Sequence, residues 1–205
     1  KILHPASIWP AQLYKIPVKL LNTMQPEAKG TLISEEAGSV GVKAVAAKDG
    51  IIAIKIKSSR MLLAYGFLRK IFEVFEKYRT SIDMITTSEV AVSVTIDSDV
   101  HLKEIIKELD PFGTIDTDAH LKEIIKELEP FGTVEVDTDQ SIISIVGNEI
   151  AKTDHILERL FQSLANVPVR MVSYGGSPHN ISLLVPSSYR TQTLQLLNKG
   201  IFGLE

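Results

Sequence analysis

Apolar positions along the chain recur with two periods, one typical of helices and one typical of strands. In YGFLRKIFEVFEKYR, residues 65–79, apolar side chains return every three or four positions and charged ones fill the opposite face, which predicts an amphipathic helix. Runs such as VAVSVTI, residues 90–96, alternate every second position and predict strands. The first series of elements is strand, helix, strand, strand, helix and strand, at residues 50–57, 65–79, 83–88, 90–96, 101–109 and 134–139.

A second series with the same order begins after residue 140. Its strand, helix, two strands and helix are predicted at residues 141–147, 155–164, 169–176, 180–186 and 189–199. A β-α-β-β-α-β order with an antiparallel sheet and helices on one face is ferredoxin-like, so we expect an α+β protein with two such modules. The second module lacks a final strand of its own. We expect residues 40–47 to complete it, which would interleave the two modules in sequence.

The boundaries follow from these patterns. Residues 1–33 hold a short helix, a strand and a loop, too little for a domain; the first module takes residues 34–139 and the second takes residues 140–205. The Asp49-Gly50 pair lies between two apolar alternating runs and is a strong hairpin signal. We therefore expect a turn there, with a strand on each side.

A second kind of repeat is a near-identical tandem duplication. HLKEIIKELDPFGT at residues 101–114 returns as HLKEIIKELEPFGT at residues 120–133, with Asp110 replaced by Glu129. A ferredoxin-like module needs one helix at this point of the chain. We therefore expect one copy within residues 101–133 to pack on the first module's sheet and the other to be surplus.

Composition and charge remove several classes of partner. The 205 residues are 44% hydrophobic and 23% charged, which is ordinary for a globular protein, and the net charge of −3 leaves no basic stripe for nucleic acid. No apolar run reaches the length of a membrane span, so we expect no membrane partner. The chain has no cysteine and its five histidines lack the spacing of metal ligands, so we expect no metal site and a cytoplasmic protein.

Polar side chains are concentrated where two predicted strands meet, in SIDMITTSEV at residues 81–90. Polar groups beside buried strands cost free energy unless the protein or a ligand hydrogen-bonds them. Ordinary turn chemistry is one explanation, with Asp83 capping the chain or pairing with a nearby lysine. An effector site is the other.

Four stretches of the chain resemble aspartokinases. MLLAYGFLRKIFEVFEKYRTSIDMITTSEVAVSVTID, residues 61–97, resembles their first ACT module, and SIISIVGNEIA with RMVSYGGSPHNISLLVP, residues 141–151 and 170–186, resembles the second. Residues 1–33 resemble the end of the catalytic domain, an α/β amino-acid kinase domain. The resemblance implies the regulatory region of an enzyme that phosphorylates aspartate with ATP and Mg²⁺ under feedback control. The family's nucleotide and aspartate residues would precede Lys1, so we expect no catalytic residue and no kinase activity in this chain.

The resemblance also implies a lysine-sensitive type that binds L-lysine where two first modules meet in a homodimer. An amino-acid effector carries a carboxylate and an ammonium; the free N–H groups at the helix beginning after Gly66 favour the first, and Asp83 can take the second. Met61, Phe67 and Leu68 would line the apolar stem. The residues expected to bind the effector are Met61, Gly66, Phe67, Leu68, Ser81, Ile82, Asp83, Thr87, Ser88 and Glu89.

Two alternatives remain open. The modules can belong to a bifunctional aspartokinase with homoserine dehydrogenase that responds to threonine, or they can dimerise without binding any effector. The pattern Thr86-Thr87-Ser88-Glu89 favours lysine over threonine. The apolar Leu62-Leu63-Ala64-Tyr65 favours the reverse, because lysine-sensitive relatives often carry polar groups there.

Overall fold

The computed structural model describes residues 3–34, 39–61, 65–97 and 117–203, in two compact units, Lys1–Val40 and Gly41–Glu205. The first unit holds helix α1 (Pro5–Leu13) and an antiparallel pair of strands, β1 (Val18–Leu20) and β2 (Thr31–Ile33). Helix α1 begins after His4, whose ring accepts a hydrogen bond from the Ala6 N–H and caps the first turn. Strand β2 was not predicted, since only three residues of a loop-like stretch form it.

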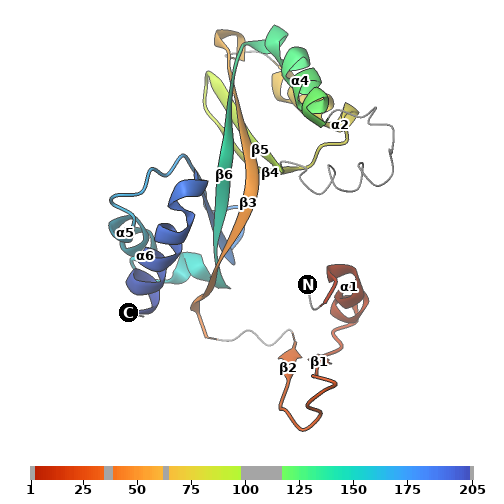
Figure 1. The fold of residues 1–205 in the computed structure, drawn as a ribbon, viewed down its shortest axis with the longest axis vertical. Helices are drawn as coiled ribbons and strands as arrows, with labels where there is room; N and C mark the ends of the chain where they lie inside the picture. Colours follow the sequence, from red (N-terminus) through yellow and green to blue (C-terminus); the bar gives the residue numbers. More distant parts are fainter. Residues whose placement is uncertain (1–2, 35–38, 62–64, 98–116, 204–205) are drawn as a thin grey trace. The chain divides into compact units, whose positions relative to one another are not determined.

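The second unit is built on one antiparallel sheet of six strands in the order β4-β5-β3-β6-β8-β7. Figure 1 shows its strands β3 and β6 side by side. Strands β3 and β6 are long, and their two halves pair with different neighbours. The strands are β3 (Gly41–Lys57), β4 (Ile82–Thr87), β5 (Ala91–Asp97), β6 (Thr133–Asn148), β7 (Met171–Ser173) and β8 (Asn180–Pro186). Each half of the sheet has the strand order of a ferredoxin-like module, with β3 and β6 shared between them.

The predicted hairpin at Asp49-Gly50 is wrong. Strand β3 runs straight through these residues, and its first half pairs with residues 142–148 of β6 while its second half pairs with residues 133–140. Both halves of β3 pair with the same long strand, β6, so they do not pair with each other and no tight turn forms between them. The Asp-Gly pair instead forms an irregularity in the pairing, where Gly50 has a φ of 70° that glycine adopts at little cost.

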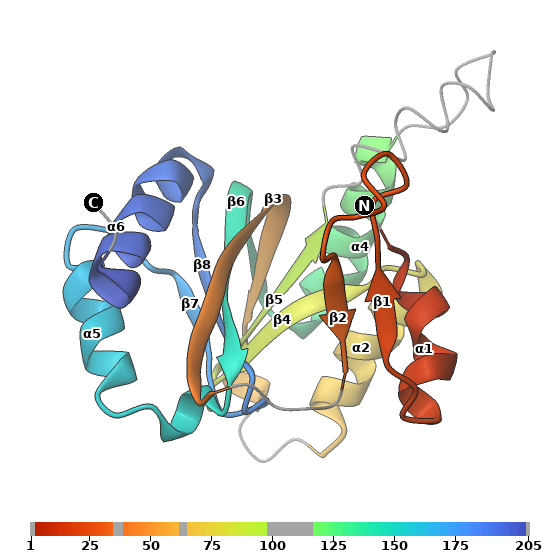
Figure 2. The same ribbon diagram turned by 90° about the horizontal axis from the view of Figure 1, so that it is seen from below.

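Helices cover one face of this sheet in both modules. Helices α2 (Phe67–Lys77) and α4 (Thr117–Leu128) pack on the first half, and α5 (Ile156–Ser163) and α6 (Arg190–Phe202) pack on the second. We call this the outer face of the sheet. In Figure 2 the strands of this sheet lie between the two helix pairs, because the sheet curls around its other, inner face.

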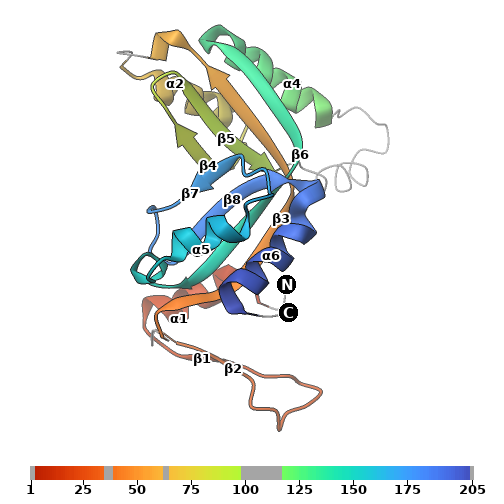
Figure 3. The ribbon, with the colours of Figure 1, turned by 90° about the vertical axis from the view of Figure 1, so that its left-hand side faces the viewer.

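The inner face has a small core of its own that joins the two modules. Edge strands β4 and β7 contact each other across it, and Figure 3 shows them side by side. Its buried members come from both modules: Ile51, Ala53, Met84, Ile142, Met171 and Leu184. The modules are therefore linked by shared strands and by apolar contact.

The second copy of the duplicated segment supplies helix α4. Its Ile124 and Leu128 are fully buried in the core of the first module, beside Val74 of α2. The first copy, residues 101–114, lies outside the described residues. The expectation that one copy packs on the sheet is confirmed for the second copy.

Candidate functional site

The residues expected to bind an effector lie at two opposite ends of strand β4. Helix α2 precedes β4 in sequence and runs antiparallel to it. The first residues of α2 therefore lie at the same end of the module as the last residues of β4. Ser58, at the end of β3, donates its N–H to the Val90 carbonyl at 2.8 Å and holds that end together. One group, which we call the helix-start group, is Met61, Gly66, Phe67, Leu68, Thr87, Ser88 and Glu89, and the other, the strand-start group, is Ser81, Ile82 and Asp83.

Within one protomer these two groups are too far apart to hold one small amino acid. Asp83 and Thr87 are separated by four steps along the extended strand β4, which is roughly 13 Å. In a single chain the structure therefore does not bring the two groups together.

The beginning of helix α2 is open to an anion. Gly66 precedes the helix in a left-handed conformation (φ 78°), no side chain caps the first turn, and that turn contains no acidic residue. The first N–H groups of any helix lack partners inside it, and the helix dipole favours negative charge there. Among the described residues, and apart from its chain neighbours, no atom lies within 4 Å of a Cβ added at Gly66.

The three apolar members of the helix-start group belong partly to the core. Met61, Phe67 and Leu68 are half-buried and pack against the first module's core. The Phe67 ring meets the edge of the Phe131 ring at a centroid distance of 6.0 Å. These side chains are held in place without a ligand, and their exposed parts remain available to one.

The turn between β4 and β5 uses part of its polar chemistry on itself. The Ser88 N–H donates to the Ala91 carbonyl at 2.8 Å, and the Ser88 hydroxyl donates to the same oxygen at 3.4 Å. For Ser88, ordinary turn chemistry is the explanation that the contacts support. The side chains of Thr87 and Glu89 are exposed beside it.

In the strand-start group, Asp83 pairs with a lysine of its own chain. The Lys48 ammonium lies 2.9 Å and 3.1 Å from the two oxygens of Asp83 and 2.7 Å from an oxygen of Asp97. Burial lowers the pKa of Lys48, but the hydrogen bonds to Asp97 and Asp83 outweigh it and the pKa is raised. The sequence raised the possibility of such a pair without naming the partner, which lies on a distant strand.

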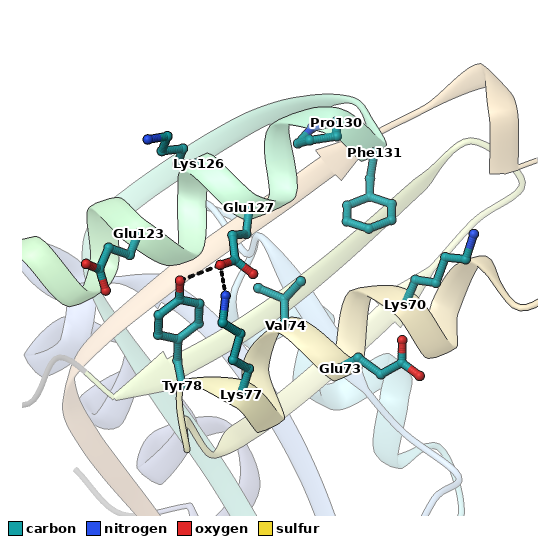
Figure 4. A pocket seen from close by; sticks show the side chains of 10 residues that line it. All are labelled: Lys70, Glu73, Val74, Lys77, Tyr78, Glu123, Lys126, Glu127, Pro130 and Phe131. Atoms are coloured by element: carbon teal, nitrogen blue, oxygen red, sulfur yellow. Dashed lines mark hydrogen bonds and ion pairs between the residues drawn. The ribbon is translucent and has the colours of Figure 1, made fainter.

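Sequence reasoning missed a groove between α2 and α4, with a volume of about 770 Å³. Figure 4 shows charged side chains along its rim and Phe131 near one end. Glu127 accepts a hydrogen bond from the Tyr78 hydroxyl at 2.6 Å and pairs with the Lys77 ammonium. The bond from Lys77, and then that from Tyr78, lowers the pKa of Glu127. Complementary charges on the two helices were visible in the sequence, but nothing local indicated that they meet.

Among the described residues, no group of three or more histidine, cysteine, aspartate or glutamate side chains is placed to hold a metal ion. In the same part of the chain, no helix has the length and apolar character needed to cross a membrane.

Comparison with known proteins identifies the family. A sequence model described as ACT domain matches residues 143–200. A solved C-terminal regulatory domain of aspartate kinase from Porphyromonas gingivalis W83 is 42% identical, with 78% of this chain and 96% of that chain covered and a TM-score of 0.60. The chain belongs to the aspartate kinase family. The ferredoxin-like α+β fold predicted from the sequence is thereby confirmed as a pair of ACT modules.

Longer members of the aspartate kinase family match nearly the whole chain. Escherichia coli aspartokinase III, solved in complex with lysine and aspartate, is 31% identical over 98% of this chain and 42% of that chain, with a TM-score of 0.77. Aspartokinase 2 of Arabidopsis thaliana, a chloroplastic protein, is 35% identical over 98% of this chain. This chain spans 36% of the Arabidopsis enzyme, so it corresponds to the regulatory part of aspartate kinases.

Proposed function

We propose that this chain senses L-lysine and dimerises through its first ACT module, as the regulatory region of an aspartate kinase. The whole protein would transfer a phosphoryl group from ATP, with Mg²⁺, to the side-chain carboxylate of L-aspartate, and the site for that chemistry would lie in an adjoining kinase domain. The family and the lysine complex of the E. coli relative support this proposal. The compartment stays a prediction.

The observation that carries the proposal is the placement of complementary chemistry at the two ends of an edge strand. The helix start at Gly66 suits a carboxylate, and Asp83 suits an ammonium. Strand β4 is an edge strand, and edge strands readily pair with a second chain. Ile85 in its middle is 40% exposed, and Val90 at the following turn is 52% exposed.

A homodimer in which β4 pairs with its own copy would unite the two groups. A two-fold axis through the middle of β4 makes the strands antiparallel, so the beginning of one strand meets the end of the other. Asp83 of the partner subunit would then approach Thr87 and the start of α2. Each dimer would form two equal sites, each taking the carboxylate from one protomer and the ammonium from the other.

One observation favours a second candidate, a dimerisation module without effector binding. Lys48 already neutralises Asp83, so this carboxylate has a structural partner in the chain. A threonine-responsive region of a bifunctional enzyme has less support, because the E. coli relative is solved in complex with lysine.

Calorimetric titration of L-lysine into the 205-residue chain tests the proposal. Replacing Asp83→Asn should weaken binding roughly tenfold to hundredfold, because a hydrogen bond to a charged group contributes about 1.5–3 kcal/mol. The matched control is Asp154→Asn, which removes an exposed carboxylate from the second module and should leave binding unchanged. Light scattering on the same samples should give the mass of a dimer.

Three outcomes would count against the proposal. Equal lysine affinity in wild type and Asp83→Asn would remove Asp83 from the site. Dimers that release no heat with lysine would favour the second candidate. A monomer at high protein concentration, with and without lysine, would exclude the shared site.

A further inference from the structure

Two consecutive residues at the middle of strand β3 are tied to different modules. Lys48 bonds to Asp83 and Asp97 of the first module. Asp49 accepts a hydrogen bond from the Ser141 hydroxyl at 2.8 Å and lies 3.0 Å from Nε of Arg190, the residue that begins helix α6 in the second. Strand β3 therefore passes from one module to the other where the Lys48 ammonium pairs with two carboxylates.

The contact of Lys48 with Asp83 reproduces the chemistry that an amino-acid effector needs. A primary ammonium lies within hydrogen-bond distance of both oxygens of Asp83, at 3.1 Å and 2.9 Å. A second ammonium, from a free amino acid, would need the same oxygens and the same direction of approach. The Lys48 side chain is about half exposed (49%), so solvent and a ligand can reach it.

We infer that Lys48 is a tethered competitor for the cation position at Asp83, and that an effector ammonium binds there by displacing it. This inference rests on the proposed function, because it concerns the same site. The displaced Lys48 ammonium keeps a counter-charge, because the Asp97 carboxylate lies 2.7 Å from it and can pair with it alone. The competitor lowers lysine affinity, while Asp97 keeps a counter-charge beside the displaced Lys48 ammonium.

The size of the effect follows from the exposure of the pair. Exposed ion pairs contribute about 0.2–1 kcal/mol, so removing the competitor should strengthen lysine binding by about 1.4-fold to fivefold. Lys48→Met keeps most of the side chain's length and apolar stem while removing the charge. Lys55→Met is the matched control, because Lys55 lies on the same strand with similar exposure and pairs instead with Glu135 at 3.9 Å.

The test is calorimetric titration of L-lysine into four variants of the 205-residue chain: wild type, Lys48→Met, Lys55→Met and Lys48→Met combined with Asp83→Asn. Circular dichroism first confirms that each variant is folded. We expect tighter binding for Lys48→Met alone, no change for Lys55→Met, and no benefit of Lys48→Met once Asp83→Asn is present. A benefit that persists with Asp83→Asn would mean a long-range charge effect and would overturn competition at Asp83.

The remaining outcomes separate this inference from the proposed function. If Asp83→Asn weakens lysine binding and Lys48→Met leaves it unchanged or weaker, the competition is wrong and the lysine site stands. If neither wild type nor Lys48→Met binds lysine, both are overturned. If wild type does not bind and Lys48→Met does, the competition is supported and the wild-type chain is no lysine sensor.

Discussion

Replacing Leu128→Ala tests which copy of the duplicated helix the first module uses. Leu128 is fully buried between α4 and the first module's core, so the substitution leaves a cavity. It removes three buried carbon atoms worth about 0.8 kcal/mol each, and the residual cavity brings the expected loss of unfolding free energy to about 3 kcal/mol. Leu109 holds the same position in the first copy of HLKEIIKEL. With the second copy packed on the sheet, Leu109→Ala should cost less than about 0.5 kcal/mol.

The duplication also allows an alternative in which either copy packs on the sheet, and the size of the stability loss distinguishes the two cases. If the first copy could replace the second at equal free energy, Leu128→Ala would simply shift the population to the intact copy. The loss would then be only about 0.4 kcal/mol, the free energy of choosing between two equal states. The double variant would still lose about 3 kcal/mol, because both copies would then carry the cavity.

Urea denaturation of the 205-residue chain, followed by circular dichroism at 25 °C, measures all three variants. A loss confined to Leu128→Ala supports the packing seen in the structure. Small losses for both single variants with a large loss for the double variant would show that the copies exchange. Equal, large losses for Leu109→Ala and Leu128→Ala would show that both copies are structural, which would refute the reasoning.

Two further predictions concern the first module. Gly66→Ala should lower the free energy of unfolding by about 1–2 kcal/mol, because a φ of 78° is costly for any residue with a Cβ. Gly176→Ala is the control, since an added Cβ would likewise contact no described atom there, and it should be near neutral by thermal denaturation. Equal effects of the two substitutions would contradict this prediction. The hydrogen bond from Lys77 holds the pKa of Glu127 below its ordinary value of 4.5. The Glu127 carboxylate therefore stabilises the fold above pH 4.5, and this contribution is lost as the pH falls through the lower pKa of the folded state. The melting temperature of Glu127→Gln should therefore lie below that of wild type near neutral pH and approach it below pH 4.5, and a gap independent of pH would exclude this role.

The residues of the candidate site could be named from sequence, but their spatial arrangement could not. The glycine before α2, the apolar residues after it and the polar turn after β4 lie where the periodicity placed them, because each depends on its own short segment. The pairing of Asp83 with Lys48 joins residues 35 positions apart, on strands that are not neighbours in the sheet. The separation of the two groups by the length of β4 likewise required the strand to be seen in its sheet.

The sequence by itself determined the types of element and their order, and hence two ferredoxin-like modules, because helix and strand periods reflect which side chains face a core. Tertiary structure decided the course of residues 41–57. An Asp-Gly pair favours a tight turn locally, but the hydrogen bonds that both halves of β3 form with the long β6 replace those of a hairpin. The continuous strand is favoured over the hairpin by contacts between β3 and β6, which lie far apart along the chain. No local pattern of residues could therefore have predicted it.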